Sequence, residues 1–548
     1  MSPACQHRIL IVGGGLGGLA LAQGLKHTSP SVPFHIFERD SSADFRPQGY
    51  RIRINPDGAG ALRKLLPDNL WKAYENTCAL FNPAMSGLDA VTGQKPTPSG
   101  ERRGPPPMPE GKYYNADRVV LRNVLMEGLE DDISFGKTFK SYRVTSDGVE
   151  VTFTDGTKET GAILVGADGT RSHIRRQLMP NYTVLDTECG AIYGKTFTKP
   201  ETRASMANEF FGGICLAGDG SKPGLKLFTD TMEFPRDLSL DERAKYRVPD
   251  DYVYWVLCIN RPLLGIAAED LHGLDAAQSV ETTLQMTKSW HPTVRSLLQK
   301  QEQSASSTLA FFACLPETFK REWDELVKSP DCAAVTLLGD AAHPMTPVGG
   351  VGANSAFQEA ADLCSVITRA SFGAEALKDY AKLMTERGEE TVGLSGGGAE
   401  HMFQMKPFSE LKLTSDILSY ARRGSTKERL ATKSNDFNMS TRLPSQQPIG
   451  AMCSQASWTT IVTAGAIAVT SIFLIALRFW TSSGKPKVKI LLQDEIKSAR
   501  RRALEYCFNP RAVMAKGYVK DMQIEYTHFG GPAEYVIHAI KANLTGSL

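Results

Sequence analysis

The stretch Arg8-Ile9-Leu10-Ile11-Val12-Gly13-Gly14-Gly15-Leu16-Gly17-Gly18 decides the fold of this 548-residue chain. Arg8–Val12 is a short apolar run typical of a buried strand, and Leu16–Lys26 has the small, apolar face of a helix that packs on a sheet. Phe34–Phe37 predicts the next strand. The three segments form a βαβ unit and predict an α/β fold with a Rossmann-type domain.

The glycine turn of this unit has the spacing that binds a dinucleotide. Gly13 permits a tight turn, Gly15 lets the backbone approach a pyrophosphate, and Gly18 allows the helix to pack closely on the strand. The start of the helix offers unpaired N–H groups to the phosphates. Glu38, 20 residues past the last glycine, follows the second strand and is expected to accept hydrogen bonds from a ribose. A single turn of this kind serves FAD or NAD, not both.

Two later segments favour FAD. Val335–His343 predicts a strand that delivers Asp340 at a turn, where the carboxylate is expected to hold a ribitol hydroxyl. Gly350–Asn354 begins a helix whose N–H groups would stabilise negative charge on a flavin. Earlier in the chain, the buried strand Ile163–Gly166 leads to Ala167-Asp168-Gly169. The order and spacing of these segments predict bound FAD.

The length of the chain predicts two or three packed units. Alternating apolar and polar runs, such as Tyr252–Ile259, indicate a sheet inserted between two parts of the FAD-binding domain. The expected units are the first part of the FAD-binding domain (1–184), the substrate-binding sheet domain (185–300), the return of the FAD-binding domain with its helices (301–400), a polar linker (401–457), a transmembrane helix (458–480) and a basic tail (481–548).

The bulk composition excludes several functions. The chain has 62 Lys and Arg against 60 Asp and Glu, so its net charge of +2 favours neither nucleic acid nor an acidic partner. Its 10 cysteines are scattered without a Cys-x-x-Cys pair, which argues against a zinc site or a disulfide framework and indicates a reducing compartment. We therefore expect no metal, and no pattern in the sequence points to an oligomeric state.

The apolar stretch 458–480 predicts a single membrane helix near the C-terminus. Its core Ile461–Leu477 carries no charge and tryptophans mark both ends, and at ~1.5 Å per residue the stretch spans the ~30 Å hydrocarbon core. The alternative is a helix buried in protein. Supply of FAD would place the FAD-binding part in the cytosol, on a membrane such as the endoplasmic reticulum, whereas the basic residues after the helix favour a cytosolic tail. Modification of the sequon at Asn543 would prove a lumenal tail.

Three motifs together resemble the FAD-dependent monooxygenases of the para-hydroxybenzoate and salicylate hydroxylase type, above all fungal members from secondary-metabolite pathways. The motifs are the glycine turn, Ala167-Asp168-Gly169-Thr170-Arg171-Ser172 and Gly339-Asp340-Ala341-Ala342-His343-Pro344, and the resemblance covers roughly residues 7–400. In the family, the segment with Asp168 and Arg171 is associated with both FAD and NADPH. The resemblance implies that FAD contacts Gly13, Gly15, Gly18, Glu38, Gly49, Arg51, Arg118, Asp168, Asp340 and Ala353.

The resemblance also implies the reaction. NADPH binds transiently and reduces the flavin, and one oxygen atom of O2 passes to the substrate while the other leaves as water. On the substrate side, Lys195 could pair with a phenolate and Tyr254 could donate a hydrogen bond; the open alternative is an outward lysine and a packed aromatic ring. We interpret His343 as a structural residue of its turn rather than as a general base.

The implied substrate is an apolar natural product. Hydroxylation of an aromatic polyketide is the first reading, and epoxidation of a prenylated, meroterpenoid olefin is the alternative. A flavin halogenase is disfavoured because the chain has no Trp-x-Trp-x-Ile-Pro segment after the glycine turn. A non-catalytic relative that holds a prenylated partner is the remote alternative, and an unretained flavin without NADPH oxidation would favour it.

Overall fold

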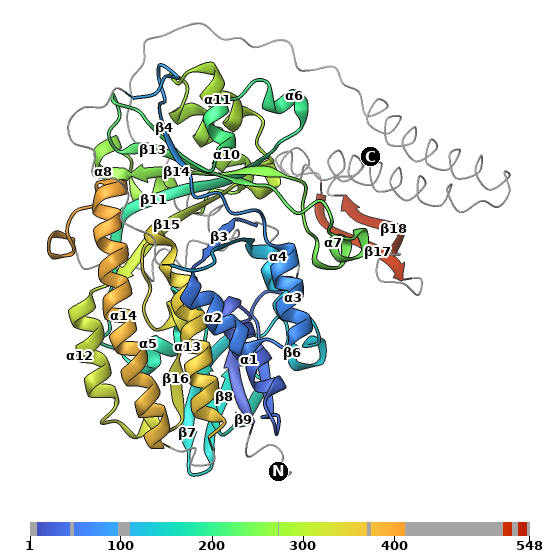
Figure 1. Cartoon of the computed structure of the whole chain (residues 1–548). Coiled ribbons are helices and arrows are strands. Elements are labelled where there is room, and N and C mark those ends of the chain that lie inside the picture. Colours follow the sequence, from blue (N-terminus) through green and yellow to red (C-terminus); the bar gives the residue numbers. More distant parts are fainter. Residues whose placement is uncertain are drawn as a thin grey trace, which may run out of the picture. The chain divides into compact units, whose positions relative to one another are not determined.

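The computed structural model describes most of the chain (Figure 1). It divides into two compact units, Met1–Phe437 and Asn438–Leu548. In the described part, no helix combines the length and the apolar character needed to cross a membrane. The predicted membrane helix 458–480 and most of the basic tail lie outside the described residues, so both stay predictions. The described residues are 8–43, 49–96, 110–271, 273–369, 374–411, 519–528 and 535–544.

The first unit contains the predicted Rossmann-type sheet, in which every pair of neighbouring strands is parallel. The strand order is β16-β10-β1-β2-β6. The central strands are short, continuous apolar runs because helices or other strands cover both faces of a parallel sheet. The strands are β1 (Ile9–Val12), β2 (Phe34–Phe37), β6 (Ile133–Ser134), β10 (Ile163–Gly166) and β16 (Val335–Leu337).

Helices pack on this sheet and on one another. Helix α1 packs against α13 and α2, and the long helix α14 lies beside α12 and α13 (Figure 1). A three-stranded antiparallel sheet, β7-β8-β9, completes this domain. The elements are α1 (Leu16–His27), α2 (Pro56–Leu65), α3 (Asp68–Thr77), β7 (Phe139–Thr145), β8 (Gly148–Phe153), β9 (Lys158–Gly161), α5 (His173–Leu178), α12 (Pro316–Leu326), α13 (Val351–Ile367) and α14 (Ala374–Phe403).

A second sheet is built largely from the part of the chain where the sequence predicts a separate sheet domain, in the order β15-β11-β14-β13-β12-β4. It recruits strands from both sides of the expected range 185–300, because β4 pairs parallel to β12 and β15 pairs antiparallel to β11. Local sequence patterns do not reveal such long-range pairing. The strands are β4 (Met85–Asp89), β11 (Val184–Phe197), β12 (Ile214–Gly218), β13 (Leu225–Met232), β14 (Tyr252–Asn260) and β15 (Ser307–Cys314).

Strand β14 is buried along its whole length and separates two hydrophobic cores. Side chains alternate across a strand, so Tyr252 and Tyr254 join the core of the FAD-binding domain, whereas Val253 and Trp255 join a second core. The second core is closed by helices from the middle of the chain. The helices in this part of the chain are α6 (Pro200–Arg203), α7 (Leu240–Tyr246), α8 (Arg261–Leu264), α9 (Ala268–Leu271), α10 (Ala276–Met286) and α11 (Pro292–Gln299). Of these, α7 packs on α3 and on α4 (Arg118–Met126), and its Tyr246 belongs to the core of the FAD-binding domain.

A two-stranded ribbon connects the two sheets. Strand β3 (Arg51–Ile54) pairs antiparallel with β5 (Tyr114–Asp117), and helix α4 (Arg118–Met126) follows β5 directly. Asp117 begins this helix because its Oδ1 accepts a hydrogen bond from Val119 N at 2.8 Å. Because Arg51 is the register partner of Asp117, the ribbon brings Gly49, Arg51 and Arg118 together at the same end.

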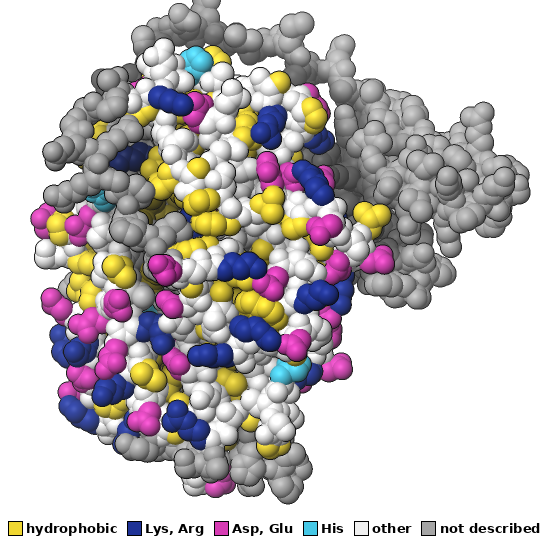
Figure 2. Space-filling view, in the orientation of Figure 1, with side chains coloured by type: hydrophobic (Ala, Val, Ile, Leu, Met, Phe, Trp, Pro, Cys, Tyr) yellow, Lys and Arg dark blue, Asp and Glu magenta, His cyan; other side chains and the backbone are white. Residues whose placement is uncertain are grey.

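In the second unit, the described residues form one antiparallel hairpin of β17 (Val519–His528) and β18 (Tyr535–Leu544). In the first unit, Figure 2 shows Lys and Arg side chains interspersed with Asp and Glu over the described part of the visible face. This mixed surface agrees with the nearly balanced charge of the whole sequence.

Candidate active site

The glycine turn is built for a close approach of another group. Gly13 has φ +118°, and a Cβ there would lie 2.2 Å from the Ala167 oxygen; a Cβ on Gly18 would lie 2.2 Å from the Gly13 oxygen. A Cβ on Gly15, by contrast, would meet no atom within 4 Å. Helix α1 begins after Gly15, and no side chain caps its first turn. The turn therefore offers backbone N–H groups to an open space, which fits a pyrophosphate.

Glu38 lies beside this turn, as the sequence predicts. Its buried carboxylate accepts hydrogen bonds from Gly14 N at 2.7 Å and from Asp40 N at 2.9 Å. Arg122 holds the other side of the turn, with Nε 3.1 Å from the Gly14 oxygen and Nη1 2.9 Å from the Ala43 oxygen. Sequence analysis missed Arg122. Its position four residues after Arg118, on the same helical face, was the available signal.

The loops that carry Asp168 and Asp340 meet at the same edge of the sheet, because β10 and β16 are neighbouring parallel strands. Thr170 Oγ1 donates to Asp340 Oδ2 at 3.3 Å. Asp168 Oδ2 accepts from His173 N at 2.8 Å, whereas its buried Oδ1 has no hydrogen-bond partner among the described residues. An unpaired buried carboxylate oxygen is costly, so Asp168 is a candidate to receive a donor from a ligand.

Arg175, a second residue missed by sequence analysis, clamps these two loops together. Its buried guanidinium donates to the Ala341 oxygen at 2.7 Å, the Asp340 oxygen at 3.2 Å and the Thr170 oxygen at 2.7 Å. The sequence feature that could have revealed Arg175 is the segment Asp168-x-x-x-Ser172, which caps α5. Side chains in the first turn of a helix point back toward its N-terminus, so an arginine there lies over the preceding loop.

Asp340 is exposed, yet the protein around it desolvates the carboxyl group and raises its pKa. A side chain that is both solvent-accessible and surrounded by protein lies in a concave place. Helix α13 starts close by: a Cβ on Gly352 would lie 3.7 Å from Asp340 Oδ1. Gly349 and Gly350 precede this helix with φ of +80° and +65°, and no side chain caps it. Half-buried Ala353 lies in its first turn.

These observations fit FAD. The open cradle at Gly15, the unpaired Oδ1 of Asp168, the accessible carboxylate of Asp340 and the two uncapped helix starts offer donors and acceptors that complement a pyrophosphate, a ribitol chain and an electron-rich ring edge. Sequence analysis named most of these groups, and the structure brings them to one edge of the sheet.

Lys195 and Gly49, far apart in the sequence, lie together. A Cβ on Gly49 would lie 2.7 Å from Asp117 Oδ1 and 3.0 Å from Lys195 Nζ. Lys195 is buried rather than outward, and its Nζ lies 3.2 Å from Asp117 Oδ2. The hydroxyl of Tyr252 donates to the same oxygen at 2.8 Å. Asp117 therefore holds Lys195 in place, and the catalytic role of Lys195 stays a prediction.

Arg51 reaches across to the second sheet. Its Nε and Nη2 donate to Asp230 Oδ2 at 2.9 and 2.5 Å, and Arg53 Nη2 donates to the same oxygen at 2.8 Å. Asp230 is almost fully buried. Burial and the neighbouring Arg51 lower the pKa of Arg53 to about 10. Because Arg51 and Arg53 share the single carboxylate of Asp230, the group of three side chains carries a net positive charge.

A row of aromatic rings extends from Arg118 to Arg51 along the face of the second sheet that carries Tyr193 and Tyr254. The ring centres of Tyr50 and Tyr193 are 5.6 Å apart, those of Tyr193 and Tyr254 are 6.4 Å apart, and those of Tyr254 and Phe228 are 6.2 Å apart. The guanidinium of Arg118 lies 5.5 Å from the centre of the first ring, and that of Arg51 lies 5.3 Å from the last. Burial raises the pKa of Tyr254 well above its usual range, so it stays a neutral hydroxyl.

His343 is buried in the turn that carries Asp340, with Nε2 2.5 Å from Glu359 Oε1. This geometry confirms the structural role predicted for it.

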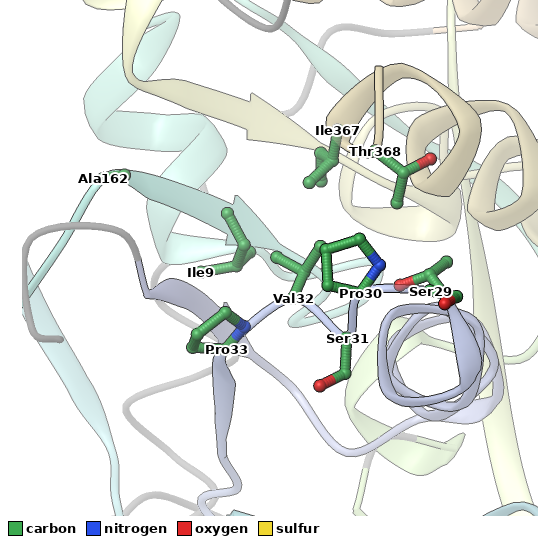
Figure 3. Close-up of a pocket in the computed structure, with 10 residues that line it drawn as sticks. Ile9, Ser29, Pro30, Ser31, Val32, Pro33, Ala162, Ile367 and Thr368 are labelled. Carbon is green, nitrogen blue, oxygen red and sulfur yellow. The ribbon is translucent and has the colours of Figure 1, made fainter. Parts of the chain in front are cut away.

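One cavity lies away from the loops that carry Asp168 and Asp340. Figure 3 shows its residues at the amino ends of β1 and β2, where Ile9, Val32 and Pro33 face Ile367 and Thr368. Its volume is about 290 Å³. Parallel sheets bind cofactors at the carboxyl ends of their strands, so this cavity is separate from the flavin-type loops.

Comparison with known proteins agrees with this geometry. Residues 324–393, which include the Asp340 turn, match a family model described as an FAD binding domain. Over 453 residues the chain is 35% identical to the dual O-methyltransferase/FAD-dependent monooxygenase elcB of Phaeosphaeria nodorum, an alignment that covers 74% of this chain and 47% of elcB. The chain thus spans about half the length of that relative.

A second relative aligns over nearly its whole length. The FAD-dependent monooxygenase thnD of Trichoderma harzianum is 29% identical over 407 residues, covering 71% of this chain and 91% of thnD. The fold is shared with Klebsiella pneumoniae HpxO, solved with FAD and uric acid, at a TM-score of 0.54 and 17% identity, covering 78% of this chain and 95% of HpxO. In its loops, its relatives and its fold, this chain is similar to FAD-dependent monooxygenases of fungi.

Proposed function

We propose that this protein is an FAD- and NADPH-dependent monooxygenase that hydroxylates an aromatic polyketide in secondary metabolism. The observation that carries the proposal is the aromatic and cationic sheet face, which the β3–β5 ribbon connects to the flavin-type loops. When bound, FAD supplies reduction by a nicotinamide and activation of O2. The names of both curated relatives, each an FAD-dependent monooxygenase, support this activity.

The loops at the carboxyl edge of the sheet hold the cofactor in this proposal. Gly13, Gly15 and Gly18 with the start of α1 take the pyrophosphate, and Glu38 takes the ribose. Asp340 takes the ribitol chain, and the start of α13 near Ala353 faces the ring. Arg118, at the start of α4, is the remaining residue proposed to contact FAD.

The sheet face provides the substrate surface. Tyr193, Tyr254 and Phe228 offer apolar area for a planar ring and exclude water from it. Lys195 uses one of its three N–H donors on Asp117, which leaves donors for a phenolate oxygen. The positive charge that remains around Asp230 favours the ionised form of a phenol. An acidic phenolic polyketide matches both features.

Arg171 supports transient NADPH binding beside Asp168. Partial burial and the positive charge of Arg39 lower the pKa of Arg171. Arginine side chains are suited to binding phosphate groups. The same site would release NADP once the flavin is reduced.

Membrane attachment through 458–480, with the catalytic part in the cytosol, is also part of the proposal and rests on the sequence pattern. Glycosylation at Asn543 in a microsomal translation assay would support this orientation. An unmodified sequon together with a protease-accessible tail would reverse it.

Turnover under ¹⁸O2 tests the activity. Full-length yellow protein with NADPH is offered phenolic polyketides and prenylated olefins, and products are analysed by mass spectrometry. One ¹⁸O atom in a phenol product is expected. Label in an epoxide would instead establish olefin epoxidation, and peroxide without labelled product would reject the substrates offered. Colourless protein without NADPH oxidation would favour the binding-protein alternative.

A further inference from the structure

Glu359 on α13 joins two sides of the turn that presents Asp340. Its Oε2 accepts from Gly339 N at 2.8 Å, and its Oε1 lies 2.5 Å from His343 Nε2. Both partners flank Asp340 in the sequence, one directly before it and one three residues after it. Glu359 and His343 are completely buried. One carboxylate therefore fixes both ends of the turn.

The imidazole of His343 depends on Glu359. Its Nδ1 has no hydrogen-bond partner in the part of the chain that is described. Helix α12 presents the ring of Phe319 at 5.8 Å, edge to face, and α14 presents Gly388, where a Cβ would lie 3.0 Å from His343 Cδ2. Neither residue can exchange a proton, so the charged groups that act on the imidazole are Glu359 and Asp340.

These two carboxylates favour an imidazolium. Burial alone would lower the pKa of His343, but the charges of Glu359 and Asp340 and the hydrogen bond to Glu359 together raise it. Deprotonation of His343 as the pH rises removes the positive charge from this pair and weakens its 2.5 Å contact with Glu359, because the donor is no longer charged.

We propose that Glu359 is a positioning residue for FAD: its carboxylate joins Gly339 N to His343 Nε2 and so holds closed the turn that presents Asp340 to the cofactor. The inference rests on the proposed FAD site and extends it to a buried pair that does not contact the cofactor. It follows that FAD binds tightly while His343 is protonated and more weakly as the pH rises through the raised pKa of His343.

The test is the FAD dissociation constant of the full-length protein, measured by flavin fluorescence across about pH 6 to 9. For the unaltered protein we expect the affinity to fall on the order of tenfold toward alkaline pH, the worth of one charge-assisted hydrogen bond. Glu359→Gln can still accept from Gly339 N and can donate to a neutral imidazole. It should therefore bind FAD at every pH as the unaltered protein does at alkaline pH, with a flat profile.

Two further variants sharpen the result. Glu359→Ala loses both hydrogen bonds and should bind FAD more weakly at every pH. Asp362→Asn removes the same charge one turn further along α13, where the carboxylate pairs with Arg387 at 2.7 Å away from the turn, and should keep the full pH profile. His343→Gln gives a second neutral version of the pair and should be flat like Glu359→Gln, should that variant fail to fold.

Several outcomes would overturn the proposal. A Glu359→Gln or His343→Gln protein with the full pH dependence would show that the pair is only structural. An unaltered protein that binds FAD equally at all pH values would remove the role of Glu359 while leaving the FAD site in place. An unaltered protein that binds no FAD at any pH would remove both.

Discussion

The side chain of Lys195 shows how a neighbour decides what a residue can do. Its ammonium is buried and lies 3.2 Å from Asp117 Oδ2, which also accepts from Tyr252 and caps α4. Sequence analysis identified the lysine from its place in the sheet domain but not the aspartate, because their contact joins residues 78 positions apart. The same holds for Arg51, whose partner Asp230 carried no signal in the sequence.

Lys195→Met separates the two roles of this lysine. Loss of Lys195 leaves the buried carboxylate of Asp117 without its counter-charge and should cost about 3–5 kcal/mol of folding free energy. The double variant Lys195→Met/Asp117→Asn should recover most of that stability in a denaturant titration. If Lys195 serves the substrate, the double variant still retains flavin but loses substrate-dependent NADPH oxidation. Normal kinetics in the double variant would leave Lys195 with a structural role alone.

Asp340→Ala tests the cofactor-binding turn. Removal of the accessible carboxylate should weaken FAD retention at least on the order of tenfold, because a charged hydrogen-bond acceptor is lost. Absorbance of flavin per protein after gel filtration measures the loss. Thr170→Ala removes only the 3.3 Å contact to Asp340 and should retain far more flavin. A fully yellow Asp340→Ala protein would contradict the assigned role.

At the scale of elements, the strand–turn–helix units were predictable because their signals are local. The glycine turn follows β1 directly, and the Asp168 and Asp340 loops follow β10 and β16, so the parallel sheet brings all three to one edge. The contacts that lock these loops were not predictable. These contacts join Arg122, Arg175 and Glu359 to backbone atoms of other segments of the chain. In the sequence, a charged residue on the buried side of a helix cannot be distinguished from one on the exposed side until the packing is known.

The glycine turn predicts two different outcomes for the same substitution. Gly13→Ala places a methyl group 2.2 Å from a backbone oxygen at positive φ, so the protein should fail to accumulate in folded form. Gly15→Ala meets no protein atom and should fold with near-normal thermal stability. It should still lose FAD, because the methyl group fills the space left for the pyrophosphate. A Gly15→Ala protein that stays yellow would remove the pyrophosphate from this position.

At the scale of the first compact unit, Asp230 links the two sheets. It lies on β13 and binds two arginines of β3, so an ion pair attaches the ribbon that leads to Arg118 to the second sheet. This link explains how a sheet domain assembled from separate parts of the chain is held to the flavin-type loops. Composition and length predicted the two parts but not the residue that joins them.

Asp230→Asn should loosen this junction. Two half-buried guanidinium groups lose their counter-charge, which is expected to lower the free energy of unfolding by about 3 kcal/mol. Thermal unfolding and limited proteolysis near β3 would show the effect. The substitution Asp250→Asn, at an exposed acid before β14, is the matched control and should change neither. Unchanged unfolding of Asp230→Asn would mean that the aromatic row alone holds the sheets together.

Strand β14, buried on both sides, constrains which sequence changes this chain can accept. Tyr252 and Tyr254 belong to the core of the FAD-binding domain, whereas Trp255 fills the opposite core, so a one-residue insertion would exchange the two sets and unfold both cores. Variation along this strand is therefore accessible through substitutions at alternate positions, and not through changes in its length.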